Sequence, residues 1–192
     1  MSSKKLFFLT HGVGGNSNGC FFPSLKSFLE GKSIKVIAPS YPNSPDPIFD
    51  EWKEVFLNKI KEEWKGEDIY LLGHSLGGYF TLRLLGECFD HEWTKHLKGV
   101  VLVAPTSTKR PERRRFYSEE IKWENILKLT FKLILLYSNN DEKVAPEHSQ
   151  YVIEKLSSMD GFEFRQPVNR NHFISPDEPD VIDAVNSLIE AK

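Results

Sequence analysis

Gly73-His74-Ser75-Leu76-Gly77 is the stretch of sequence that decides the fold. The apolar run 68–72 stands directly before it and has the length of a buried strand. Residues 77–85 follow it and predict a helix. A strand that turns this sharply into a helix strains the backbone at the central residue and lifts its side chain above the sheet, and small flanking residues are needed because Cβ atoms would clash. The stretch therefore predicts a reactive Ser75 hydroxyl, with an ordinary glycine-rich turn as the alternative.

Strand-like and helix-like segments alternate outward from this turn along the whole chain. The predicted strands are 5–10, 35–38, 69–73, 99–103, 132–137 and 163–166, and the predicted helices are 21–30, 48–64, 76–89, 146–156 and 179–190. Apolar residues recur at helical spacing in the second helix, at Ile48, Trp52, Val55, Phe56 and Ile60. This alternation predicts an α/β fold, a three-layer α/β/α sandwich around a mainly parallel six-stranded sheet. Active sites of such sheets lie at the carboxyl ends of the strands.

Bulk composition narrows the class of protein. The chain has 192 residues, of which 40% are hydrophobic, and a formal net charge of −2. These values predict a single domain, 1–192, and give no overall attraction to nucleic acid or to an anionic membrane. No apolar run approaches the length of a membrane span. Cys20 and Cys88 lack metal or redox spacing, so we expect reduced thiols in a cytoplasmic protein without a metal or another cofactor.

One segment, at about residues 106–130, interrupts the alternation and predicts a small insertion. It contains a basic run at 109–115, Lys-Arg-Pro-Glu-Arg-Arg-Arg. The run fits a solvated loop, and it also fits a small cap that prefers acidic substrates or partners. Trp123, within the insertion, is expected to supply apolar lining to a substrate pocket. His11 and His74 flank the expected site and are the other candidate pocket residues.

A serine hydroxyl becomes a nucleophile when a base takes its proton, and a third group must orient that base. Asp141 follows the strand at 132–137, and His172 follows the last strand, so a parallel sheet brings both to the edge that holds Ser75. Glu142 is the nearest alternative for this role, but Asp141 lies closer to the strand end. Asp141 could also be only a turn or helix-capping residue. Of the six histidines, only His172 follows the last strand. We predict a catalytic triad of Ser75, Asp141 and His172.

Backbone N–H groups should complete the site as an oxyanion hole. One is expected from Leu76, directly after the nucleophile, and the other from Val13, in the glycine-rich turn 11–15 after the first strand. A phosphate-binding loop is the competing interpretation of this turn. The chain lacks the Gly-x-Gly-x-x-Gly and Gly-Lys-Ser/Thr spacings that a phosphate loop requires, so the oxyanion hole is favoured.

With these residues in place, the chain resembles the α/β-hydrolase superfamily, and within it the small serine hydrolases of the retinoblastoma-binding protein 9 and YdeN type. The matching motifs, in order, are His11-Gly12, Tyr41-Pro42-Asn43, Gly73-His74-Ser75-Leu76-Gly77, Trp123-Glu124, Ser138-Asn139-Asn140-Asp141 and Asn171-His172-Phe173. The resemblance implies a minimal hydrolase fold without a large lid, and the same triad. The implied activity is that of a carboxylesterase-like serine hydrolase, which cleaves small carboxylic esters, thioesters or amides through an acyl-enzyme.

Two features depart from this resemblance. Arg170-Asn171 stand where the family often has glycine before the catalytic histidine, and the arginines at 113–115 are not typical of it. A protein-binding or scaffolding module on a hydrolase fold, with the basic run as a docking patch, is therefore the second hypothesis. The Leu-x-Cys-x-Glu motif that would bind a retinoblastoma-type partner does not occur in the sequence, so no protein partner is assigned.

Overall fold

The computed structural model describes residues 4–108 and 113–191. The strands are β1 Lys5–Thr10, β2 Lys35–Ile37, β3 Asp68–His74, β4 Leu97–Val103, β5 Lys132–Leu136 and β6 Phe162–Arg165. They form a six-stranded sheet in the order β2-β1-β3-β4-β5-β6, and each neighbouring pair is parallel. The predicted α/β sandwich with a six-stranded sheet is therefore confirmed.

Helices connect the strands. They are α1 Phe22–Gly31, α2 Phe49–Glu63, α3 Leu76–Glu87, α4 Trp123–Ile126, α5 Pro146–Leu156 and α6 Pro179–Glu190, with a short 3₁₀ helix, η1, at Glu92–His96. Every strand and helix expected from the sequence begins and ends within two residues of its predicted bounds. Helices α4 and η1 were not predicted, because so few residues contain too little of a helical repeat to be recognised. In the described part of the chain, no helix has the length and apolar character that crossing a bilayer requires.

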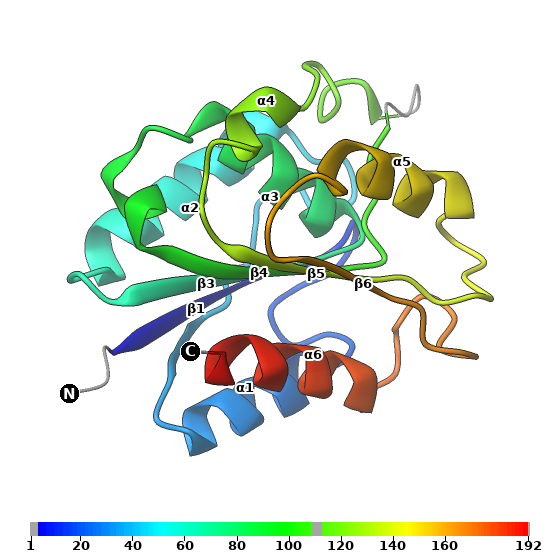
Figure 1. The fold of residues 1–192 in the computed structure, drawn as a ribbon, viewed down its shortest axis with the longest axis horizontal. Helices are drawn as coiled ribbons and strands as arrows, with labels where there is room; N and C mark the ends of the chain where they lie inside the picture. Colours follow the sequence, from blue (N-terminus) through cyan, green and yellow to red (C-terminus); the bar gives the residue numbers. More distant parts are fainter. Residues whose placement is uncertain (1–3, 109–112, 192) are drawn as a thin grey trace.

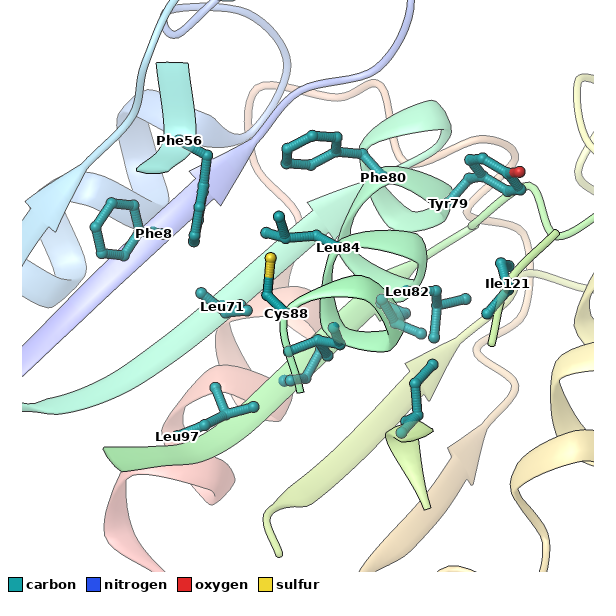
Figure 2. Close-up of a cluster of buried hydrophobic side chains, with 14 of the residues drawn as sticks. Phe8, Phe56, Leu71, Tyr79, Phe80, Leu82, Leu84, Cys88, Leu97 and Ile121 are labelled. Atoms are coloured by element: carbon teal, nitrogen blue, oxygen red, sulfur yellow. The ribbon is translucent and has the colours of Figure 1, made fainter. Parts of the chain in front are cut away.

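The helices cover both faces of the sheet (Figure 1). Helices α1 and α6 pack on one face, where Leu25, Val185 and Leu188 join a buried cluster with side chains of the strands. Helices α2, α3 and α5 pack on the other face around a larger cluster, part of which is drawn in Figure 2. Helix α3 is at the centre of that face, and residues 76–86 are all buried. The fold therefore encloses α3 along almost its whole length, and this burial holds its N-terminus firmly against the sheet.

The order of the strands reverses beside β1. The chain passes from β1 to β2 on one side and then crosses to β3 on the other, so the carboxyl ends of β1 and β3 are neighbours. Their register pairs Thr10 with Gly73, which places the turn after β1 next to the turn after β3. Open parallel sheets bind ligands in the crevice at such a reversal. The fold thus brings the glycine-rich turn 11–15 to Ser75.

Candidate active site

Ser75 lies at the sharp turn between β3 and α3, in a strained backbone conformation. Its φ of 56° and ψ of −119° lie in a region that residues with a side chain rarely adopt. The N–H of Ser75 donates to the carbonyl oxygen of Val103 at 2.9 Å, which ties the turn to β4. A Cβ atom at Gly77 would overlap the backbone of Thr10, so the close approach of α3 to β1 requires glycine there. The local geometry is the one that the sequence predicted for this stretch.

His172 and Asp141 form a buried hydrogen-bonded pair. His172 Nδ1 lies 2.8 Å from Asp141 Oδ2, and the side chains are 9% and 0% exposed. The other carboxylate oxygen, Oδ1, accepts the backbone N–H groups of Lys143 at 2.8 Å and Val144 at 2.9 Å. Burial alone would raise the pKa of Asp141, but the hydrogen bonds from His172, Val144 and Lys143 outweigh it and hold the pKa below its usual value. An ionised Asp141 keeps the proton of His172 on Nδ1 and leaves Nε2 as an acceptor.

A series of hydrogen bonds joins the loop that carries Asp141 to the loop that carries His172. Side-chain oxygens of residues 138–140 accept backbone N–H groups of residues 169–171. The three bonds run from Arg170 N to Ser138 Oγ at 2.9 Å, from Asn169 N to Asn139 Oδ1 at 3.0 Å and from Asn171 N to Asn140 Oδ1 at 2.9 Å. We call this set the loop latch. It fixes the backbone of residues 138–140, before Asp141, against that of residues 169–171, before His172.

Asn171 explains why the chain does without glycine before His172. Its φ is 49°, and that of Asn169 is 60°, so both residues adopt the left-handed conformation. Asparagine enters this region more readily than other residues with a side chain. The departure from the family pattern at this position therefore preserves a backbone conformation of the kind that glycine favours.

His74 connects the turn of Ser75 to the loop of His172. Its Nε2 lies 2.9 Å from the carbonyl oxygen of His172, and because a carbonyl only accepts, Nε2 carries the proton and donates. Its ring packs against those of His172 and Phe21, with centroids 4.9 Å and 5.5 Å away. Burial, and then the neighbouring His172, lower the pKa of His74 to about 4. His74 is thus a neutral donor at neutral pH.

The turn after β1 packs directly on Ser75. A Cβ atom built at Gly12 would lie 3.0 Å from Ser75 Cβ, so glycine permits the approach. Gly14 N donates to Ser44 O at 2.9 Å and Gly15 N donates to Gly12 O at 3.1 Å. For Val13 N we find no acceptor in residues 4–108 and 113–191. A free N–H at this position is what the sequence predicted for one half of an oxyanion hole, and Leu76 N, at the first position of α3, is the other candidate.

His11 holds this turn in place. The backbone N–H of Tyr41 donates to His11 Nε2 at 3.2 Å, so Nδ1 carries the proton and donates to Gly12 O at 2.8 Å. The ring also packs edge-on against Tyr41 and Trp52. Burial lowers the pKa of His11, and the hydrogen bond to Gly12 opposes this only in part. His11 is therefore a buried neutral side chain that orients the turn.

A pocket of about 370 Å³ opens over Ser75, and the turns at the carboxyl ends of five strands line it. The expected residues that line it are His11, Val13, His74, Ser75, Leu76 and His172. Asp141 lies behind His172. Sequence reasoning did not assign Cys20, Thr106, Tyr117 or Lys143 to this pocket, although they also line it. These four carry no recognisable motif, and only the folded turns bring them together.

The expectation for Trp123 was wrong. Its side chain lines a second, smaller pocket and packs edge-on against Tyr151 of α5, with ring centroids 5.7 Å apart. Helix α4 packs against α3, and its Trp123 contacts α5 and does not line the Ser75 pocket. Tyr117, from the same insertion, lines the Ser75 pocket instead. Of the basic run, residues 109–112 lie outside the described chain.

The site is built for acid–base and nucleophilic chemistry. A hydroxyl, an imidazole with a defined tautomer and an ionised carboxylate meet at one edge of the sheet, beside backbone N–H donors and the N-terminus of α3. Among the residues that the structure describes, no group of three or more His, Cys, Asp or Glu side chains could hold a metal ion.

Comparison with known proteins agrees with the fold. The model of the family described as serine aminopeptidase, S33, matches residues 31–158. The ydeN gene product of B. subtilis has 20% sequence identity and a TM-score of 0.78, with 98% of this chain and 100% of that chain covered. The monoacylglycerol lipase of Paleococcus ferrophilus has 20% identity and a TM-score of 0.70, with 95% of this chain and 92% of that chain covered. Est1E from Butyrivibrio proteoclasticus, solved with ferulic acid bound, has 16% identity and a TM-score of 0.77, with 97% and 88% covered. A search of curated protein sequences gave no match.

Proposed function

Because this chain belongs to the serine aminopeptidase, S33, family of α/β-hydrolases, we propose that it is a serine hydrolase that cleaves small carboxylic esters, thioesters or amides. The observation that carries the proposal is the hydrogen bond between His172 Nδ1 and Asp141 Oδ2 beside the strained turn of Ser75. A nucleophile, a base and a group that orients the base are the minimum that this chemistry requires. All three lie in or directly behind the 370 Å³ pocket.

The proposed reaction proceeds in two steps. Ser75 Oγ attacks the carbonyl carbon of the substrate while His172 Nε2 takes the hydroxyl proton, and His172 then gives that proton to the leaving alcohol, thiol or amine. Water attacks the acyl-enzyme by the same route in reverse and releases the acid. Asp141 keeps the imidazole in the required tautomer and stabilises the imidazolium. The N–H groups of Val13 and Leu76 bind the oxyanion of each tetrahedral intermediate.

Carboxylic esters are the first substrate class to test. The monoacylglycerol lipase and Est1E, whose structure holds ferulic acid, have this fold. The pocket is at the small end of the usual range for ligand sites, which favours short acyl or alcohol groups. The described part of the chain between β4 and β5 consists mainly of turns and irregular segments, with the four-residue helix α4 near its end.

Labelling with a fluorophosphonate tests the proposal. Wild type should be labelled and should hydrolyse short aryl esters, whereas Ser75→Ala should lose both. In His172→Ala and Asp141→Asn, kcat/KM should fall by at least about a thousandfold, because the serine loses its correctly oriented base. Ser149→Ala, at a buried serine of α5 that does not line the pocket, serves as the matched control. Full esterase activity in Ser75→Ala would disprove the assignment.

A further inference from the structure

We propose that the pocket selects esters that carry a carboxylate, and that Arg113 is the residue that binds this carboxylate. The inference rests on the proposed hydrolase function and names its substrate class. It starts from the charges around the pocket. Arg113 and Lys143 line it from two different turns, and no Asp or Glu is among its lining residues in the described part of the chain. The lining side chains therefore attract an anionic group and repel a cationic one, while the carboxylate of Asp141, behind His172, is already bound by His172 and by two backbone N–H groups.

Arg113 is positioned by contacts of its own. One guanidinium nitrogen, Nη1, donates to the carbonyl oxygen of Pro45 at 2.9 Å, in the loop before α2. The carbonyl oxygen of Arg113 accepts the N–H groups of Phe116 at 2.9 Å and Tyr117 at 3.2 Å. Pro45 O is a neutral acceptor and occupies one of the five guanidinium N–H groups. This bond does not use the other four N–H groups, two of which can form a two-pronged pair with a carboxylate.

Buried contacts fix the segment that carries Arg113 relative to Ser75. Phe116 is fully buried, and its carbonyl oxygen accepts Arg83 Nη1 at 2.9 Å. The hydroxyls of Tyr117 and Thr106 are hydrogen-bonded at 2.7 Å, and Thr106 N donates to Ser75 O at 3.2 Å. A continuous set of contacts therefore runs from Ser75 to the segment that carries Arg113. A cation held in this way recognises a substrate group at a defined place in the pocket.

The arginines of the basic run have different surroundings. Arg115 Nη1 lies 3.6 Å from Asp46 Oδ2, and this carboxylate offsets the charge of the arginine. Arg114 is exposed and does not line the pocket. Only Arg113 of these three lines the pocket of Ser75. This makes Arg114 the natural control for any effect of net charge alone.

The same charges argue against recognition of a free α-amino group. An aminopeptidase must bind the α-ammonium of its substrate, usually through a carboxylate or several carbonyl oxygens, because an unpaired buried ammonium is costly. The described lining of this pocket has two cationic side chains, Arg113 and Lys143, and no carboxylate side chain. We therefore expect carboxylate-bearing esters to be hydrolysed better than aminoacyl amides.

The test compares matched esters that differ in one charge. The carboxylate on the alcohol side is tested with 4-acetoxybenzoate against its methyl ester, and the carboxylate on the acyl side with monophenyl adipate against methyl phenyl adipate. Each kcat/KM is divided by the rate of hydroxide-catalysed hydrolysis of the same ester, which removes differences in intrinsic reactivity. The readout is the ratio of charged to neutral ester for wild type, Arg113→Gln, Arg113→Lys and Arg114→Gln.

Wild type should prefer the charged ester by about fivefold or more in one of the two arms, and that arm identifies the side that Arg113 faces. Arg113→Gln should remove the preference, Arg113→Lys should keep part of it, and Arg114→Gln should match wild type. High salt should reduce the wild-type ratio, because ions screen the attraction.

Three results would overturn the inference. They are a wild-type ratio of one or less in both arms, an unchanged ratio in Arg113→Gln, and faster hydrolysis of alanine 4-nitroanilide than of either charged ester. If the neutral esters are still hydrolysed with Ser75 labelled, the hydrolase function stands while the substrate class fails. If no ester is hydrolysed and Ser75 is not labelled, the proposed function fails, and the inference fails with it.

Discussion

His74 is a titratable residue that is buried in its neutral form beside the proposed base. It is 5% exposed, and burial lowers its pKa from 6.5 to about 4. In the unfolded chain the same imidazole takes up a proton near pH 6.5. Between these two values the unfolded state binds more protons than the folded state, so acid favours unfolding. The loss of stability caused by His74 is absent above about pH 6.5 and complete below about pH 4.

We predict that His74→Leu flattens the pH dependence of stability. As the pH falls from 6.5 to 4, wild type should lose up to about 3 kcal/mol more of its free energy of unfolding than His74→Leu, because only wild type contains this buried imidazole. Urea unfolding at several pH values, followed by far-UV circular dichroism, measures the difference. At neutral pH the variant should be the less stable of the two, since the carbonyl of His172 loses its donor.

His91→Gln is the control for this experiment. His91 is exposed and follows α3, away from the pocket. If His91→Gln flattened the pH dependence as much as His74→Leu, the effect could not be assigned to the burial of His74. Identical slopes for wild type and His74→Leu would contradict the assignment of a buried neutral His74.

At the scale of single elements, the approach of α3 to β1 sets the position of Ser75. Gly77 is in the first turn of α3, and a Cβ atom there would overlap the carbonyl oxygens of Thr10 and His11. These are backbone atoms of the sheet and of the proposed oxyanion turn, so they cannot rotate away as a flexible side chain could. Relief of the overlap must move α3, and with it Ser75.

Gly77→Ala should therefore lower the free energy of unfolding by at least about 3 kcal/mol and abolish fluorophosphonate labelling in whatever protein remains folded. Chemical denaturation and labelling of the soluble fraction measure the two effects.

Gly31→Ala is the matched control, because Gly31 ends α1 with open space around it. There the same substitution should change stability by less than about 1 kcal/mol. A folded, fully labelled Gly77→Ala protein would show that α3 does not fix the nucleophile.

The elements of this fold are largely predictable from sequence, for a physical reason. Buried strands and amphipathic helices repeat their apolar residues over many positions, and parallel order follows from their alternation. That order then brings Asp141 and His172 to the edge of Ser75. The direction of Trp123 could not be read in this way, because it depends on how the four-residue helix α4 packs. The loop latch was missed for a similar reason, since serine and asparagine in a loop give no signal of which distant N–H they bind.

At the scale of the whole molecule, two hydrophobic layers share one sheet. All four tryptophans of the chain belong to or pack against the cluster on the α2–α3 face: Trp52, Trp64, Trp93 and Trp123. Leu188 of α6 is buried in the cluster on the opposite face, where its side chain fills the space above Gly99 of β4. Tryptophan fluorescence therefore reports on the cluster of the α2–α3 face, and a substitution of Leu188 perturbs the cluster on the opposite face.

Leu188→Ala should lower the free energy of unfolding by about 2–4 kcal/mol through the cavity that it leaves. If the two layers unfold together, tryptophan fluorescence and far-UV circular dichroism should shift to the same lower midpoint in denaturant.

Ser187→Ala, at the exposed neighbouring residue of α6, should leave the midpoint as in wild type within about 0.5 kcal/mol. A fluorescence midpoint that stays at the wild-type value in Leu188→Ala would instead mean that the two faces of the sheet unfold separately.

The loop latch also bears on how this chain can be altered. The partners in the loop of His172 are backbone N–H groups, so the latch recognises the path of residues 169–171 and not their side chains. The side chain at position 170 takes no part in the latch and contacts Asp180 of α6 instead, so its exchange removes that ion pair but none of the three latch bonds. Shortening either loop by one residue shifts all three pairings together. For an engineer, residues 138–141 and 169–172 form one transplantable cassette, whose two halves must be grafted at once.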